Sequence, residues 1–194
     1  MHPAPFAYRV AHTIEEALEL LRTHEDAKIL AGGQSLVPAL KLRLTSPAML
    51  IDISRIPGLG GISRENGTLH IGATATHRQV EKSAVVQEAT PVLAAIGHHV
   101  ADVQVRHRGT FGGSLVHADP AADWPAGALA ADATMVIAGP DGKREVHASE
   151  FFTGMLTTVV GPGEMLVEVR LPANGTPGVY RKHANAASGF ACLR

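Results

Sequence analysis

The chain has 194 residues, a formal net charge of -1, 45% hydrophobic residues and 18% charged residues. This composition predicts a globular protein with a substantial core, built as one domain or two small lobes, and excludes a disordered chain. Because basic and acidic residues nearly balance, we expect no nucleic-acid partner.

The cysteine content and the N-terminus indicate the compartment. The single cysteine, Cys192, cannot build a disulfide framework. It cannot hold an iron–sulfur cluster either, because such a cluster normally takes four thiolates, so any cluster must come from another chain. The N-terminus lacks the basic start and long apolar run of a secretory signal, and no apolar stretch approaches the roughly 20 residues of a membrane helix. We therefore expect a cytoplasmic chain without a membrane span.

Helices and strands alternate in the first part of the chain. Apolar residues recur at helical spacing from Thr13 to His24, where Thr13 and Glu16 form a capping box. Short apolar runs at 28–31 and 49–53 predict two buried strands. A second helix is expected from about Ser35 to Leu44, after a pair of glycines.

Hairpins are the dominant pattern in the rest of the chain. Asn66-Gly67 and Pro140-Asp141-Gly142 each lie between two strand-like runs and predict tight turns. From Pro91, which suits the first position of a helix, apolar residues continue at helical spacing to Val100. Residues 165–171 predict a late strand.

This change of pattern along the chain predicts an α+β fold with two lobes. The boundary is expected near Arg55 to Gly61, so that residues 1–57 form a small N-terminal lobe and residues 58–177 a larger second lobe. The glycine-rich run at 58–61 is interpreted as the connecting turn.

A first glycine turn, Ala31-Gly32-Gly33-Gln34-Ser35-Leu36, stands between a predicted strand and a predicted helix. Glycine lets the backbone approach a ligand and adopt positive φ. Free N–H groups at a helix start favour an anion, and Gln34 and Ser35 add side-chain donors. The pattern suits a phosphate or pyrophosphate, and it equally suits a helix cap after a tight turn with no ligand.

A second glycine turn is expected at Gly112-Gly113, with the hydroxyls of Thr110 and Ser114 on either side. Asp123, ten residues after Gly113, offers a carboxylate that can accept hydrogen bonds from vicinal hydroxyls, as on a ribose. Two such turns can hold one pyrophosphate from opposite sides.

Other interpretations of this segment stay open. His117, Asp119 and Asp123 are residue types that ligate metals, although no closely spaced pair of histidines or cysteines accompanies them. Arg106 and Arg108 are either anion ligands or solvated side chains beside a loop.

Taken together, AGGQSL at 31–36 and RGTFGGSLVHADPAADWPA at 108–126 resemble the flavin subunits of molybdenum hydroxylases. Such subunits include the medium subunit of aerobic carbon monoxide dehydrogenase and the FAD segment of xanthine dehydrogenase. The resemblance covers essentially the whole chain. It implies an α+β fold of the vanillyl-alcohol oxidase flavoprotein type, with FAD between two lobes.

The resemblance also implies which residues contact FAD. The two glycine motifs correspond to the pyrophosphate loops, Asp123 to a carboxylate that binds the adenosine ribose, and His117 to a position near the cofactor. No catalytic residue and no metal ligand are implied. The implied FAD-binding residues are Ile29, Leu30, Ala31, Gly32, Gly33, Gln34, Ser35, Leu36, Val100, Gly109, Thr110, Phe111, Gly112, Gly113, Ser114, His117, Asp123, Leu166 and Lys182.

The activity implied by the resemblance is electron transfer. A molybdenum centre in a large subunit oxidises the substrate, and electrons pass through [2Fe-2S] clusters of a small subunit to FAD in this chain. They then leave to an external acceptor, in a dimer of heterotrimers. Flavin subunits of this kind continue for about another domain beyond residue 180, so residues 178–194 are expected to begin a truncated C-terminal domain.

Two other functions stay open on the sequence. One is a flavin-free assembly module that keeps the same fold. The other is a metal-dependent hydrolase that uses the histidine and aspartates of the second motif.

Overall fold

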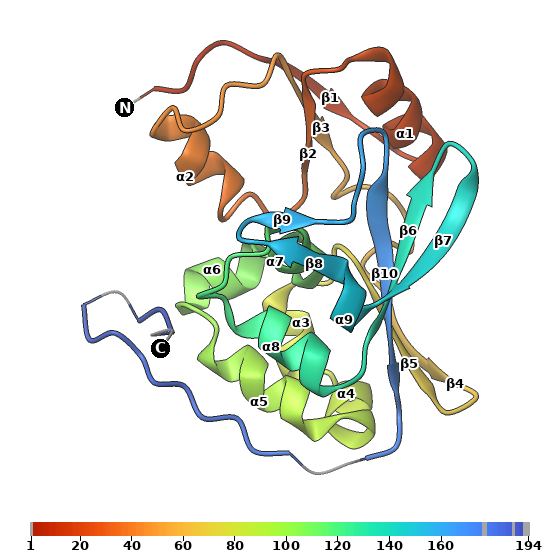
Figure 1. Cartoon of the computed structure of the whole chain (residues 1–194), viewed down its shortest axis with the longest axis vertical. Coiled ribbons are helices and arrows are strands. Elements are labelled where there is room, and N and C mark those ends of the chain that lie inside the picture. The colour runs from red at the N-terminus through yellow and green to blue at the C-terminus, as the bar shows by residue number, and fades with distance from the viewer. Residues whose placement is uncertain (1, 176–177, 188, 192–194) are drawn as a thin grey trace.

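The computed structural model describes residues 2–175, 178–187 and 189–191 (Figure 1). Cys192 lies outside the described residues. Within the described ranges, no helix is both long enough and apolar enough to cross a membrane.

The N-terminal part is a small parallel sheet with the strand order β1-β3-β2. Its elements, in chain order, are β1 (Ala7–Val10), α1 (Ile14–Thr23), β2 (Ala27–Leu30), α2 (Leu36–Lys41) and β3 (Met49–Asp52). The predicted cap of α1 is confirmed, because the Thr13 hydroxyl accepts from the Glu16 N–H at 3.1 Å. The Glu16 carboxylate accepts from the N–H of His12 at 2.7 Å, one residue before the expected partner. Strand β1 carried no clear sequence signal.

The larger sheet has five antiparallel strands in the order β4-β5-β10-β6-β7. They are β4 (Ile62–Glu65), β5 (Thr68–Gly72), β6 (Thr134–Gly139), β7 (Gly142–His147) and β10 (Met165–Pro172). Both predicted hairpins are confirmed: β4 pairs with β5 across Asn66 and Gly67, and β6 pairs with β7 across the second turn. The late strand β10 is central, because it pairs with both hairpins.

Short helices form a layer beside the larger sheet (Figure 1). They are α3 (His77–Lys82), α4 (Ala84–Ala89), α5 (Pro91–His99), α6 (Val103–Arg108), α7 (Phe111–His117), α8 (Asp123–Ala130) and α9 (Ala148–Phe151). A small hairpin, β8 (Phe152–Gly154) with β9 (Thr157–Thr158), follows α9. The predicted helix from Pro91 is confirmed, with Pro91 in its first turn.

Two hydrophobic clusters hold these layers together. The larger cluster lies between the helices and the five-stranded sheet and includes Leu93, Phe111 and Trp124, each fully buried. The smaller cluster joins the parallel sheet to the larger one, since Ile51 of β3 belongs to the same cluster as Val167 of β10. The connection between the two sheets is therefore packed core.

One prediction about local structure is wrong. Gly112 and Gly113 were expected in a turn, but they lie in the first turn of helix α7. The helix begins there because the Thr110 side chain caps it, accepting from the Gly113 N–H at 3.2 Å. Capping and packing outweigh the helix penalty of about 1 kcal/mol for each glycine.

Candidate functional site

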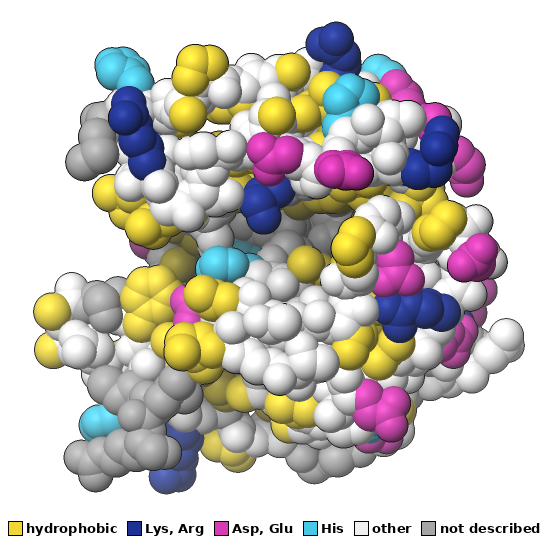
Figure 2. All heavy atoms as spheres, turned by 45° about the horizontal axis from the view of Figure 1, so that its top comes forward, with side chains coloured by type: hydrophobic (Ala, Val, Ile, Leu, Met, Phe, Trp, Pro, Cys, Tyr) yellow, Lys and Arg dark blue, Asp and Glu magenta, His cyan; other side chains and the backbone are white. Residues whose placement is uncertain are grey.

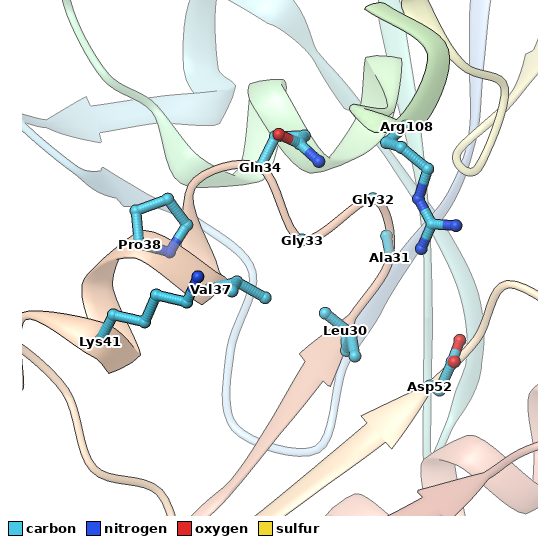
Figure 3. A pocket seen from close by; sticks show the side chains of 10 residues that line it. All are labelled: Leu30, Ala31, Gly32, Gly33, Gln34, Val37, Pro38, Lys41, Asp52 and Arg108. Carbon is cyan, nitrogen blue, oxygen red and sulfur yellow. The ribbon is translucent and has the colours of Figure 1, made fainter. Parts of the chain in front are cut away.

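The first glycine turn connects β2 to α2 (Figure 3). Gly33 has φ +72°, in the left-handed region that favours glycine. Ser35 makes no side-chain cap to α2. The backbone N–H groups of Gly33, Gln34 and Ser35 donate to no other atom within the described ranges. The turn therefore presents backbone donors to its surroundings, where an anion or water can accept from them.

Two hollows flank this turn, with volumes of about 350 Å3 and about 310 Å3. The first is lined by the run from Leu30 to Gln34 together with Lys41 and Asp52. The second is lined by Thr110 and other residues, and the two hollows share Ala31 and Arg108. Figure 2 shows the surface hollowed between the two parts of the molecule, with basic and histidine side chains at its margin.

The two glycine motifs pack directly against each other. A β-carbon on Gly32 would lie 2.2 Å from the carbonyl oxygen of Arg108 and 2.7 Å from the α-carbon of Gly109. A β-carbon on Gly113 would lie 3.9 Å from that of Ala31. The predicted convergence of the two motifs is thus present in the fold, and Gly32 is required for it.

Three consecutive backbone donors of the second motif are used within the fold. The N–H of Phe111 donates to Ala75 O at 2.8 Å, and the N–H of Gly112 donates to Ala73 O at 3.0 Å. The N–H of Gly113 is taken by the cap described above. The N–H groups of Phe111, Gly112 and Gly113 are therefore not free for a ligand, contrary to expectation. Within the described ranges the N–H of Thr110 donates to no other atom, and the hydroxyls of Thr110 and Ser114 are further polar groups of the motif.

Asp123 is buried, with 6% of its surface exposed, and is held by the C-terminal segment. Its Oδ1 accepts from the hydroxyl of Tyr180 at 2.5 Å, and its Oδ2 accepts from Nζ of Lys182 at 2.9 Å. Burial and this carboxylate raise the pKa of Tyr180. The Nζ of Lys182 also donates to His99 O at 3.1 Å. The predicted residues Val100, Asp123 and Lys182 therefore lie together beside the end of α5. A carboxylate has about four acceptor positions, so Asp123 retains capacity for a further donor.

The other predicted residues are dispersed. Leu166 lies on β10 and is 4% exposed within the main cluster, while His117 is exposed at the end of α7. Asp119 accepts from the N–H of Ala121 at 2.8 Å. Within the part of the chain that the structure describes, no three histidine, cysteine or acidic residues are placed to hold a metal ion. The metal-site interpretation therefore has no structural support.

The two arginines of the second motif have different environments. Arg106 is buried: its Nε lies 3.4 Å from Glu81 Oε2, and its guanidinium donates to Val100 O at 2.9 Å and Ala101 O at 3.0 Å. Arg108 is exposed and lines both hollows. The solvated interpretation is therefore wrong for Arg106.

Polar groups around the motifs have shifted protonation equilibria. His77 is 5% exposed, and its Nδ1 accepts from Trp124 Nε1 at 2.9 Å. Burial, aided by the charge of Arg106, lowers the pKa of His77 to about 4. Burial acts to raise the pKa of Asp52, but hydrogen bonds from Tyr8 and Ser54 outweigh it and the pKa is lowered. His77 is therefore neutral and Asp52 charged near pH 7.

Sequence reasoning missed two charged residues of the first hollow, Lys41 and Asp52, and left Arg108 open as either an anion ligand or a solvated side chain. Lys41 is the last residue of α2 and Asp52 the last residue of β3, and the parallel pairing of β2 with β3 brings Asp52 beside Leu30, where the turn begins. A charged residue near the end of the predicted strand 49–53 was the available signal for Asp52.

A family model described as "FAD binding domain in molybdopterin dehydrogenase" matches residues 4–174. The chain belongs to this family. The carbon monoxide dehydrogenase medium chain of Hydrogenophaga pseudoflava is 44% identical over 185 residues, which cover 94% of this chain and 64% of that protein. The xanthine dehydrogenase FAD-binding subunit of Escherichia coli O157:H7 is 31% identical over 178 residues, covering 91% of this chain and 61% of that one.

Solved structures agree with this family assignment. A carbon monoxide dehydrogenase from Hydrogenophaga pseudoflava superposes with a TM-score of 0.95 at 43% identity, over 98% of this chain and 67% of the matched chain. An alkyldihydroxyacetonephosphate synthase superposes with a TM-score of 0.51 at 16% identity, over 88% of this chain and 32% of the matched chain, which shows the fold alone. The predicted fold class is thus confirmed. The FAD-binding domain described here spans about two thirds of the length of its relatives.

Proposed function

We propose that this chain holds FAD as the electron-transfer part of a molybdenum-containing hydroxylase. In this role it passes electrons from [2Fe-2S] clusters of a partner subunit to an external acceptor. The observation that carries the proposal is the first glycine turn, with free backbone donors and two adjoining hollows, in a chain of the FAD-binding family.

The residues present fit the pyrophosphate of FAD. Three consecutive N–H groups of one turn donate to no other atom within the described ranges, Gly33 adopts a left-handed conformation there, and an anion satisfies such donors. Lys41 and Arg108 add positive charge at the same hollow. The glycines of the second motif contribute by packing, and Thr110 and Ser114 supply hydroxyls beside the turn.

The remaining contacts are proposals from the family pattern. Asp123 would accept from ribose hydroxyls while it keeps Lys182, and Val100 and Leu166 would contribute apolar contacts. His117 would lie near the cofactor. FAD supplies the redox chemistry when bound, and this chain supplies binding, orientation and electrostatics.

The proposed partners are an iron–sulfur small subunit and a molybdenum-cofactor large subunit, in a dimer of heterotrimers. Support comes from the similarity to a medium chain of carbon monoxide dehydrogenase and from the single cysteine. The lobe division at residue 57, a further domain from residue 178 and a cytoplasmic location stay predictions.

Flavin titration of the purified chain tests the proposed cofactor. We expect visible flavin absorbance in the purified protein, or saturable FAD binding after the flavin is removed. Colourless protein that binds neither FAD nor metal would favour the assembly module. Bound zinc or manganese in place of flavin would favour the hydrolase.

An electron-acceptor dye tests the proposed relay. The chain is mixed with candidate reducing substrates and the dye, with and without the two partner subunits. We expect dye reduction only when the partners are present. Rapid substrate-dependent reduction by this chain alone would contradict the relay and indicate a self-sufficient flavin oxidoreductase.

A further inference from the structure

We propose that Arg108 is the cationic residue that binds the pyrophosphate of FAD, opposite the N–H donors of the Gly33 turn. This inference rests on the proposed function and adds to it a residue that the family pattern did not indicate.

The guanidinium of Arg108 is available, whereas that of its neighbour Arg106 is not. Arg106 is held by Glu81 and two backbone carbonyls. In the described part of the chain, Arg108 makes no ion pair or side-chain hydrogen bond, and its side chain is exposed. Two arginines on one short helix therefore differ in role: Arg106 holds the helix in place, and Arg108 keeps its donors free for a ligand.

The position of Arg108 is fixed by its backbone. Its carbonyl oxygen packs against Gly32 so closely that a β-carbon there would lie 2.2 Å away. The next residue ends α6, where the N–H of Gly109 donates to Val105 O at 2.7 Å. Figure 3 shows the side chain reaching from this anchor past Ala31 into the hollow beside the turn. The charged group thus lies beside Ala31, where the turn begins, and no ion pair holds it within the described ranges.

The location of Arg108 between the hollows matches an elongated ligand. Arg108 and Ala31 are the residues that both hollows share, so a ligand that reaches from one hollow to the other passes the guanidinium. A dinucleotide has two bulky ends joined by a doubly charged pyrophosphate. The guanidinium binds such an anion through paired hydrogen bonds.

The charges around the turn explain why an arginine is needed there. The N–H groups of Phe111, Gly112 and Gly113 in the second motif are already used within the fold, which leaves fewer donors there for an anion. The carboxylate of Asp52 lines the first hollow and opposes a negative ligand. Lys41 lines the same hollow from α2, and Arg108 faces it from α6. The two cations together outweigh the single carboxylate.

The test measures FAD affinity of the full chain carrying Arg108→Gln or Arg108→Lys. Lys143→Gln is the matched control, because Lys143 is exposed on β7 and lines neither hollow. We expect Arg108→Gln to raise the dissociation constant roughly ten- to a hundredfold, as for a lost hydrogen bond to a charged group. Arg108→Lys should recover part of the loss, since it keeps the charge without the planar fork.

Salt dependence separates a direct charge contact from a structural role. The affinity of the wild-type chain should fall as salt rises, and Arg108→Gln should flatten that dependence while its circular dichroism stays unchanged. If the wild-type chain binds FAD and Arg108→Gln binds it as tightly as Lys143→Gln, this inference alone is overturned. If the wild-type chain binds no FAD, the proposed function fails and this inference fails with it.

Discussion

The same dipeptide, Gly-Gly, serves different purposes in the two glycine motifs. In the first motif, Gly33 adopts φ +72° and the donors beside it stay free. In the second, Gly112 lies in a helix, and a β-carbon on it would meet Ala73 O at 2.7 Å. The first pair shapes a turn with free donors and also allows close packing at Gly32, whereas the second pair serves close packing alone. Identical local sequence therefore does not imply identical backbone hydrogen bonding.

The largest expected effect comes from Asp123, in the buried corner behind the second motif. Asp123→Ala leaves the ammonium of Lys182 buried without its carboxylate, and side-chain exposure in this pair is only 8% for Lys182 and 5% for Asp123. Loss of one partner from a buried ion pair should lower the free energy of unfolding by about 3 kcal/mol. Denaturant titration measures this loss, with the half-buried Asp119→Ala as the control.

The same variant tests the ribose contact. Under conditions in which Asp123→Ala is fully folded, we expect FAD affinity to fall roughly tenfold or more. A stability loss with an unchanged dissociation constant would leave Asp123 as an anchor for the C-terminal segment and remove it from the FAD site.

Gly112→Ala should produce the next largest effect. The added β-carbon would lie 2.7 Å from Ala73 O and 2.8 Å from its α-carbon, so the backbone must shift. We expect a net loss of about 2 kcal/mol, because overpacking exceeds the gain in helix propensity of about 1 kcal/mol. Gly113→Ala is the control. Its added β-carbon would lie 2.5 Å from the Thr110 hydroxyl oxygen, and loss of that helix cap should lower the free energy of unfolding by about 1 kcal/mol. Equal stability of both variants would contradict the packing role of Gly112.

Acidification should destabilise the second motif through His77. A β-carbon on Gly109 would lie 2.6 Å from the His77 ring, so the ring forms one wall of this motif. The pKa of His77 is lowered from 6.5 to about 4, so the unfolded chain binds a proton first as the pH falls. The free energy of unfolding is therefore unaffected by His77 above pH 6.5. Between pH 6.5 and about pH 4 it falls by roughly 1 kcal/mol for each pH unit. Unfolding midpoints of the wild type and His77→Gln over this range measure the effect, and identical pH slopes would exclude His77 as its source.

Features set by local chemistry were predictable from the sequence, and features set by distant contacts were not. The Asn66-Gly67 hairpin and the Thr13 cap depend on neighbouring residues, so their patterns were sufficient. The pair between Asp123 and Lys182 joins residues 59 positions apart, and no local pattern indicates it. Likewise, the N–H of Gly112 in the second motif donates to the carbonyl of Ala73, and only the tertiary fold brings these two groups together.

The two motifs themselves were recognisable because glycine-rich segments carry a strong local signal. Which arginine stays unpaired was not recognisable: Arg106 and Arg108 lie two positions apart on a short helix, and the buried Glu81 holds Arg106. The sequence therefore indicated the two motifs that pack together, but not which of their polar groups stay free.

The most direct test of the first glycine turn compares Gly33→Val with Gly67→Val. Both glycines have left-handed backbones, at φ +72° and +77°, and Gly67 lies in the hairpin between β4 and β5, outside both hollows. The two variants therefore share the backbone strain of a β-branched residue at positive φ. FAD titration of the folded proteins should show a dissociation constant raised at least roughly tenfold for Gly33→Val, and one close to the wild type for Gly67→Val. Equal FAD affinity in the two variants would contradict the assignment of the first glycine turn as the pyrophosphate site.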